Sequence, residues 1–349
     1  MRILVIGGTH FIGLTAVRLL SEQGHKLAVF HRGQNEPELP SSIQHIHSEG
    51  KNFPVHFSSK AVEAFRRFAP EVVLHMVLFG EQDAQEAVNT FKGMARRIVA
   101  ISSQDVYGAF GRVNRHEGGP PDPLPITEDS PLRKSRYPYR ADPPRTSDDP
   151  QHWMDLYDKI PAEQIIMSEP ALPGTILRLP AVYGPGDFQH RHFPWLKRMQ
   201  DQRPVILLDE AEARWRWTHG YIDNVAAAIA LAVTDERASG RIYNVGEEVT
   251  LSMEKRVRLV GQLTDWHGRI VLAPQGRLPE ALKWDINAEQ DVVVDSSRIR
   301  KELGYQEVVS IDEAMKRTVA WESENPPDKI DAKSFDYAAE DAFLADSHL

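Results

Sequence analysis

Short apolar runs recur along the chain and alternate with helical stretches. Continuous apolar runs are typical of strands covered on both faces, and their alternation with helices is typical of a parallel sheet. The pattern therefore predicts an α/β fold built on a Rossmann-type, doubly wound parallel sheet. The expected strands are residues 2–8, 26–32, 71–78, 96–103, 174–180 and 241–247.

The length of 349 residues favours two domains or one elaborated domain. We expect a dinucleotide-binding domain in residues 1–184, completed by about 219–247. Residues 185–218 and 248–322 mix short helices and strands and are expected to form a smaller carboxy-terminal substrate lobe. Residues 323–349 are expected to be a tail. Its apolar residues would line a terminal helix or belong to a frayed end: Phe335, Ala339, Ala342 and Phe343.

The alternation stops between residues 108 and 150, where prolines and glycines crowd the sequence. Residues of this kind at such density exclude a regular element. This stretch is therefore expected to be a long loop or lid.

A glycine-rich turn follows the first expected strand. Gly7 ends the strand, Gly13 follows one turn later, and apolar residues then return at helical spacing. Backbone amides at a helix start, with the helix dipole behind them, suit a pyrophosphate. His10 stands where the middle glycine of the fingerprint is usual, and a tight turn without a ligand is the alternative. The expected cofactor contacts from this turn are Gly7, Thr9, His10, Phe11, Ile12 and Gly13.

The end of the second expected strand bears on the choice of cofactor. An NAD-selective site usually offers an acidic side chain there, and this sequence has His31 and Arg32 instead. Arg32 is suited to a 2′-phosphate through its fork of donors, so the expected cofactor is NADP or NAD, with NADP favoured. A solvated arginine at a strand end is the alternative.

Three segments in order, GGTHFIG, ISSQDVYG and LRLPAVYGPGD, resemble the extended short-chain dehydrogenase/reductase family, in particular its NAD-dependent epimerase/dehydratase branch. Weaker similarities follow in ITEDSPL (126–132), YIDNVAAAI (221–229), IYNVGEEVTLS (242–252) and KELGYQ (301–306). The resemblance implies an oxidoreductase, such as an epimerase, dehydratase or reductase. Its substrate would be a small molecule. That molecule would be either a sugar-like compound, with or without a linked nucleotide, or another polar carbinol.

The same resemblance implies the catalytic residues. Ser103 matches the residue that holds the substrate oxygen, and a strand-end serine that caps a turn is the alternative. Tyr157 matches the acid/base tyrosine, and Tyr157 and Pro180 would also contact the cofactor. The family has a lysine four residues after the tyrosine, where this chain has Pro161. That proline is expected to kink or restart a helix at Tyr157. Lys159 is then either a displaced catalytic lysine or a solvated lysine.

A free phenol titrates near pH 10, so a tyrosine that acts as a base near pH 7 needs a shift of about three pKa units. The family's lysine supplies much of that shift. Lys159 would take its place if it reached the phenol or the cofactor ribose, whereas an ion pair with Asp155 would keep it at the surface. Loss of the lysine also favours a second hypothesis, a catalytically weak dinucleotide-binding sensor or partner-binding protein.

On the substrate side, Arg216 matches a family arginine that contacts substrate phosphate. Sugar-nucleotide members usually carry asparagine where this chain has Ala181, which counts against a nucleotide sugar. Arg216 lies in ARWRWT, whose alternation predicts a strand with arginines on one face and tryptophans on the other. Solvated arginines are the alternative.

Two histidines, His190 and His192, lack supporting ligands at suitable spacing, and the remaining histidines form no ligand pattern, so no metal site is predicted.

Composition narrows the partners and the compartment. The 41 Lys and Arg against 50 Asp and Glu give a net charge of -9, which opposes binding to nucleic acid or anionic lipid. RNA binding, known in a plastid branch of the family, is therefore the weakest hypothesis. The chain has no cysteine, no membrane-spanning run and no signal-peptide pattern, so a cytoplasmic location is expected. A homodimer stays open.

Overall fold

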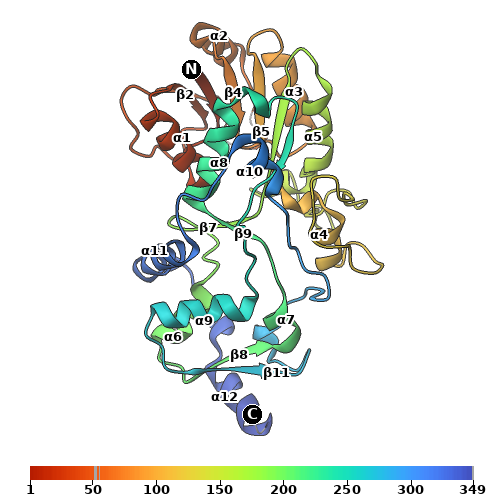
Figure 1. Cartoon of the computed structure of the whole chain (residues 1–349), viewed down its shortest axis with the longest axis vertical. Coiled ribbons are helices and arrows are strands. Elements are labelled where there is room, and N and C mark those ends of the chain that lie inside the picture. Colours follow the sequence, from red (N-terminus) through yellow and green to blue (C-terminus); the bar gives the residue numbers. More distant parts are fainter. Residues whose placement is uncertain (51–52, 55, 348–349) are drawn as a thin grey trace.

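The computed structural model describes residues 1–50, 53–54 and 56–347 and is centred on a seven-stranded parallel sheet (Figure 1). The strand order is β10-β6-β5-β4-β1-β2-β3, and all six paired edges are parallel. The prediction of a doubly wound parallel sheet is thus confirmed. The strands are β1 (Arg2–Ile6), β2 (Lys26–His31), β3 (Gln44–His47), β4 (Val72–His75), β5 (Arg97–Ser103), β6 (Gly174–Leu179) and β10 (Ile242–Asn244).

Helices cover both faces of the sheet because alternate strand residues point to opposite faces. In β1, Ile3 and Val5 pack in one core with α1 (Phe11–Glu22) and α8 (Ile222–Thr234). Leu4 and Ile6 pack in the other. That second core includes α2 (Ser59–Phe68), α3 (Glu81–Phe91) and α5 (Lys159–Ser168). Burial on both faces explains why the strands are apolar throughout.

All six predicted strands are present, and the structure adds one to this sheet, β3, that the apolar pattern does not indicate. β3 has the sequence QHIH, in which only Ile46 is buried. It pairs with β2 and ends the sheet. An edge strand with one buried side chain has no apolar run, so the pattern passes over it.

The proline-rich stretch is irregular only in part. Its first residues form α4 (Gly108–Val113), so the expectation of a loop from residue 108 onwards is wrong there. The helix forms because the prolines begin only at Pro120. From residue 114 the chain has no helix or strand until a short 3₁₀ helix, His152–Leu156.

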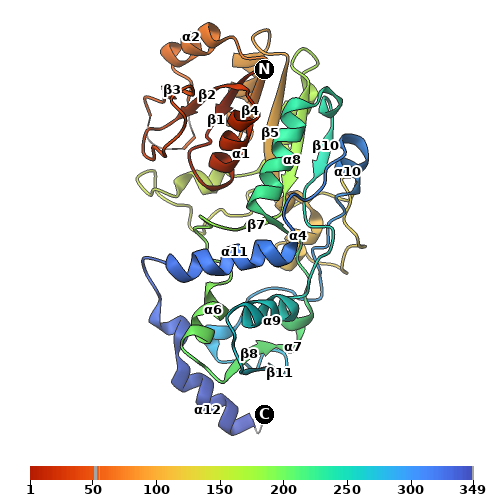
Figure 2. The same cartoon turned by 60° about the vertical axis from the view of Figure 1, so that its left-hand side comes forward.

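A smaller lobe lies below the sheet in Figure 1 and contains the parallel pair β8 (Val205–Asp209) and β11 (Arg269–Ala273). Its helices are α6 (Phe193–Gln200), α7 (Glu210–Arg214) and α9 (Met253–Leu263). Between this lobe and the sheet lie α11 (Ile311–Glu324) and the pair formed by β7 (Ala181–Tyr183) and β9 (His219–Tyr221), as Figure 2 shows from a second side.

The tail ends in α12 (Tyr337–Ser347), which is docked on the smaller lobe. Phe343 and Leu344 pack against a core that includes Val205 and Val271. Glu340 accepts a hydrogen bond from Arg198 at 2.7 Å, and both side chains are buried. Of the two alternatives for the tail, the structure therefore has the packed helix, although Phe335 precedes it and Ala342 is exposed.

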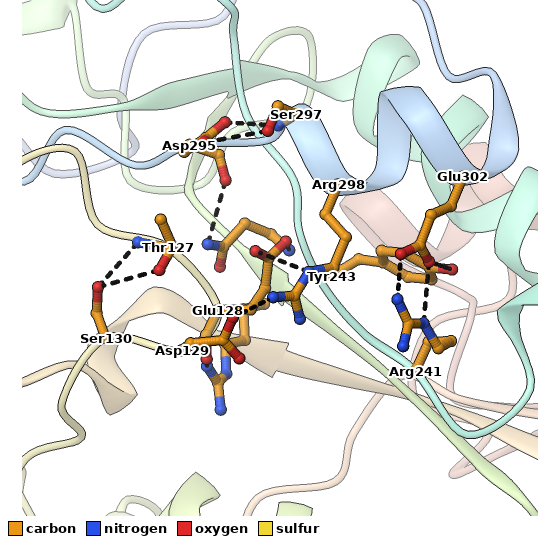
Figure 3. Close-up of polar contacts among 12 residues, drawn as sticks. Thr127, Glu128, Asp129, Ser130, Arg241, Tyr243, Asp295, Ser297, Arg298 and Glu302 are labelled. Carbon is orange, nitrogen blue, oxygen red and sulfur yellow. Dashed lines mark hydrogen bonds and ion pairs between the residues drawn. The ribbon is translucent and has the colours of Figure 1, made fainter.

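Three of the weaker sequence similarities meet in one polar network beside the sheet (Figure 3). The Glu128 carboxylate accepts from the backbone amide of Asn244 at 2.9 Å and pairs with Arg298 of α10 (Ser297–Leu303). Tyr243 donates to Glu302 at 2.8 Å. These segments join a loop, a strand and a helix, so their residues have a structural role at this place.

Candidate functional site

The glycine turn has backbone geometry that only glycine accommodates well. Gly7 and Gly8 have φ of +91° and +92°, in the left-handed region. A Cβ on Gly13 would lie 2.7 Å from Gly8 Cα, so the start of α1 is packed directly on the turn. The turn therefore lets a ligand approach the backbone at a helix N-terminus, which fits a pyrophosphate.

A cavity of about 660 Å³ opens at this turn and extends to the end of β2. Its volume lies in the range of small-molecule and cofactor sites, roughly 300 to 1,000 Å³. The predicted cofactor contacts that line it are Gly7, Thr9, His10, Phe11, Ile12, Gly13 and Arg32. The residues of the glycine turn and Arg32 thus line the same cavity.

Arg32 packs against an aromatic ring. Its guanidinium carbon lies 3.8 Å from the ring centroid of Phe53, which also lines the cavity. The position of Arg32 at the cavity suits the phosphate role better than the alternative of a solvated arginine.

The predicted catalytic residues Ser103 and Tyr157 both contact Asp105, Tyr157 at the buried carboxylate and Ser103 at the backbone amide, where it caps a short 3₁₀ helix. The Tyr157 hydroxyl donates to Asp105 Oδ2 at 2.8 Å, and the Tyr139 hydroxyl donates to the same oxygen at 3.1 Å. The backbone amide of Asp105 donates to Ser103 Oγ at 3.2 Å. Sequence reasoning missed Asp105 and Tyr139, although Asp105 lies within the segment ISSQDVYG that carries the resemblance.

Burial controls the protonation of this cluster. It raises the pKa of Tyr157 well above its ordinary value, and the nearby Asp105 raises it further. Burial also raises the pKa of Asp105, while the hydrogen bond from Tyr157 and the charges of Arg133 and Lys159 oppose that shift. Tyr157 is therefore neutral here, and its hydroxyl proton points to the Asp105 carboxylate.

Lys159 is buried, so the alternative of a solvated surface lysine is wrong. Its ammonium donates to the carbonyl oxygens of Leu78 and Ile101, the latter at 3.0 Å, and it lies 5.5 Å from the Tyr157 ring centroid. Asp155 pairs with Arg145 instead. Burial lowers the pKa of Lys159 to about 8, so the side chain is mainly charged at pH 7.

Of the two outcomes expected at Pro161, a kinked helix or a restarted one, the structure has the restart. Helix α5 begins at Lys159 after the N-cap Asp158, so the proline occupies the first turn. Amides in the first turn have no intrahelical acceptor, so the missing N–H is tolerated there. Tyr157 precedes the helix, in extended backbone with φ −66° and ψ 118°. The direction of its side chain is consequently not governed by helical spacing.

Two other predicted contacts lie elsewhere. Pro180 follows β6 at the same edge of the sheet, but it does not line the described cavity at the glycine turn. Arg216 is half exposed and forms an ion pair with Asp291 at 2.7 Å. The strand predicted for ARWRWT is wrong at Arg214, which ends helix α7, whereas Arg216 and Trp217 form isolated β-bridges. The predicted separation of the side chains is present, because both arginines are exposed while Trp215 is buried and Trp217 partly buried. Arg216 is thus paired with a carboxylate and partly exposed to solvent. This arrangement is closer to the alternative of solvated arginines than to a contact with substrate phosphate.

His190 and His192 contact α11. The His190 ring stacks on Trp321 with centroids 5.6 Å apart, and His192 Nδ1 lies 3.8 Å from Glu322. A different set of histidines does come together, namely His31, His45 and His47. The prediction that the remaining histidines form no ligand pattern is therefore wrong, because the pairing of β2 with β3 creates a cluster that sequence spacing does not show.

The strand order, the glycine turn and the cavity define the class as a Rossmann-type dinucleotide-binding protein. The chain belongs to the NAD dependent epimerase/dehydratase family, whose model matches residues 3–246. Among the described helices, none is long and apolar enough to cross a membrane.

Individual relatives are similar at low identity. The chain is 25% identical over 255 residues to 2'-dehydrokanamycin reductase of Streptomyces kanamyceticus, covering 70% of this chain and 61% of the reductase. It is 26% identical over 307 residues to dTDP-glucose 4,6-dehydratase of Streptomyces griseus, covering 87% and 80%. Among solved structures, UDP-glucose 4-epimerase of Thermotoga maritima with UDP-glucose has a TM-score of 0.62 at 19% identity, covering 93% and 99%. The chain spans less than two thirds of the reductase's length.

Proposed function

We propose that the protein is an NAD(P)-dependent oxidoreductase of the epimerase, dehydratase or reductase type that acts on a sugar-like or other polar carbinol. The observation that carries this proposal is the convergence of Ser103, Tyr157 and Asp105 at the carboxyl end of β5. In sheets of this kind the carboxyl ends of the strands form the ligand-binding edge. The glycine turn after β1 lies at the same edge.

In this proposal Ser103 polarises the substrate oxygen, and Tyr157 moves the proton of that oxygen. Asp105 takes up the phenolic proton through the 2.8 Å hydrogen bond, so a free tyrosinate never has to form. The charge of Lys159, held against two backbone carbonyls, favours the ionised form of Asp105. A nicotinamide dinucleotide, when bound, supplies the hydride donor or acceptor.

NADP is the proposed cofactor in preference to NAD. Arg32 is stacked at the end of the cavity where β2 ends, and none of the residues described as lining the cavity is acidic. A ribose 2′-hydroxyl is usually held by a carboxylate at this place, whereas a 2′-phosphate needs a cation.

A sugar-like substrate is supported by the relatives, which are named for dTDP-glucose and for 2'-dehydrokanamycin. The neighbouring epimerase structure contains UDP-glucose. Ala181 stands where sugar-nucleotide members of the resembling family usually have asparagine. The proposal therefore includes sugars that carry no nucleotide.

A matched pair of variants tests the roles of the two phenols. Tyr157→Phe and Tyr139→Phe each remove one hydroxyl that donates to Asp105 Oδ2. The substrate panel contains nucleotide sugars, free aminosugars and their keto forms. Absorbance of the reduced nicotinamide measures net oxidation or reduction, chromatography of the products measures epimerisation or dehydration, in which the hydride returns to the substrate, and calorimetry measures cofactor affinity. We expect Tyr157→Phe to lose nearly all turnover with cofactor affinity unchanged, and Tyr139→Phe to retain most of it. Full activity of Tyr157→Phe on a demonstrated substrate would overturn the assignment.

A catalytically weak dinucleotide-binding sensor is the second candidate. It is favoured by the enclosure of Tyr157, which is 9% exposed and lies within 6.3 Å, between ring centroids, of Trp153 and Phe79. Tight cofactor binding without turnover of any substrate in the panel would support the sensor and reject the enzyme.

A further inference from the structure

The histidine cluster lies at the free edge of the sheet, where β3 pairs only with β2. His31 ends β2, and the register places it opposite His47, while His45 lies opposite Val29. Residues two apart on a strand, and residues opposite each other on paired strands, point to the same face. The three imidazoles therefore extend from one face of the sheet edge.

The ring nitrogens are close enough to share one ion. One nitrogen from each of the three rings lies within 4.8 Å of the others, and His31 Nε2 lies 2.8 Å from His45 Nδ1. Zinc–imidazole bonds of about 2.0 to 2.1 Å in tetrahedral geometry separate two ligand nitrogens by about 3.4 Å. His45 and His47 are exposed, so their rings are free to rotate by the small amount needed.

A carboxylate supports the cluster from the side. Glu36 Oε1 lies 2.8 Å from His47 Nε2, so His47 donates its Nε2 proton to Glu36 and Nδ1 is the ring nitrogen left for a metal. A carboxylate that orients a histidine in this way is the usual partner of a metal-bound imidazole. Glu36 lies in the loop after β2, and Asn35 of that loop bonds to the glycine turn through the Thr9 carbonyl at 2.6 Å.

From this geometry we infer that His31, His45 and His47, with Glu36 beside them, form a site for a divalent transition metal of the zinc class. Three neutral imidazoles with a remaining open position match the ligand set that zinc, cobalt and nickel accept in proteins. This inference stands apart from the proposed enzymatic function, because it requires neither cofactor nor turnover.

Metal binding requires a change at the shared hydrogen bond of the cluster. His31 Nε2 and His45 Nδ1 lie 2.8 Å apart, and the Gly33 amide donates to His31 Nδ1, so His31 carries its proton on Nε2. The metal would take the place of the proton between His31 Nε2 and His45 Nδ1, and that single ring proton of His31 would move to Nδ1. The Gly33 amide, which donates to Nδ1 at 3.2 Å, would then have to turn away.

The test uses the full chain without an affinity tag, stripped with a chelator and titrated with Co²⁺ and Zn²⁺. We expect one equivalent of Co²⁺ to give visible d–d absorption, and Zn²⁺ to displace it. The double variant H45A/H47A alters only exposed side chains and is expected to lose at least about 100-fold in affinity, more than the 10- to 100-fold typical of supporting residues. Glu36→Gln should fall within that smaller range.

His56→Ala is the matched control, since His56 is an exposed histidine that also contacts a glutamate, Glu86, outside the cluster. It should bind Co²⁺ as the parent does. Thermal unfolding confirms that each variant is folded. Absence of stoichiometric binding by the parent at micromolar metal, or equal binding by H45A/H47A, would overturn the inference and leave the cluster as a hydrogen-bonded network.

Discussion

Replacing Gly13 by alanine tests the glycine turn with the smallest available change. The added Cβ would lie 2.7 Å from Gly8 Cα and 3.0 Å from Gly8 N, and both atoms belong to the backbone. No side chain is able to swing aside, so the turn or the start of α1 has to shift. Overpacking of this kind lowers the free energy of unfolding by about 1 to 3 kcal/mol. Up to about 1 kcal/mol of that loss is offset because alanine has a higher helix propensity than glycine.

The change in cofactor affinity should exceed the change in stability. A displaced turn misaligns amides that would bond to a charged pyrophosphate, and each such bond contributes about 1.5 to 3 kcal/mol. Loss of one bond corresponds to a roughly 10- to 150-fold higher Kd at 1.4 kcal/mol per decade. Calorimetry with NAD and NADP gives the Kd, and urea unfolding gives the stability. Gly118→Ala is the control, because a Cβ there meets nothing within 4 Å. An unchanged Kd for Gly13→Ala would mean that the cofactor does not bind on this turn.

Three further outcomes are expected. Arg32→Ala should weaken NADP by about 1.5 to 3 kcal/mol and leave NAD nearly unchanged, and equal losses by calorimetry would reject the 2′-phosphate contact. Lys159→Met should shift the pH–rate profile of a demonstrated substrate to more alkaline pH, because Lys159, with a pKa of about 8, is charged below that pH; an unchanged profile would restrict Lys159 to a structural role. Burial raises the pKa of Glu212 to about 8 from 4.5, so only the unfolded chain ionises it between those values and stability falls as pH rises. Glu212→Gln should therefore raise the free energy of unfolding by about 1 to 3 kcal/mol at pH 8 and by little at pH 4. An equal increase at both pH values in urea unfolding would contradict this.

The central strands were predictable because burial on both faces leaves a continuous apolar run in the sequence. Residues in β1 and β5 show this directly, since nearly every side chain in them is buried. β3 was not predictable in the same way, because only Ile46 of its four residues is buried. The edge of the sheet, and with it the histidine cluster, depends on strand pairing rather than on any local pattern.

The candidate site was predictable in its backbone part and only partly in its side chains. The glycines reflect a local turn, so their spacing is enough to locate the cavity. Asp105 becomes important only because the irregular segment after α4 folds back over it, with Arg133 donating to its carbonyl at 2.7 Å and Tyr139 to its carboxylate. Such long-range contacts leave no periodic signal in the sequence.

The position of Pro161 shows why a motif's spacing is an indirect measure of geometry. A spacing of four residues places a tyrosine and a lysine on one helix face only when both belong to the helix. Here α5 starts at Lys159, Asp158 caps it by accepting from the Ile160 amide, and Tyr157 lies outside it. Tyr157 and Asp158 have extended backbone, and this conformation places Lys159 Nζ 5.5 Å from the centroid of the Tyr157 ring. In the family's motif, one turn of helix brings the tyrosine and the lysine together instead. Because the loss of the standard spacing does not separate the two side chains, Lys159→Met is a test of charge. A neutral replacement that keeps the fold and still shifts the pH profile would show that the ammonium, wherever it lies along the sequence, acts on the phenol and its carboxylate.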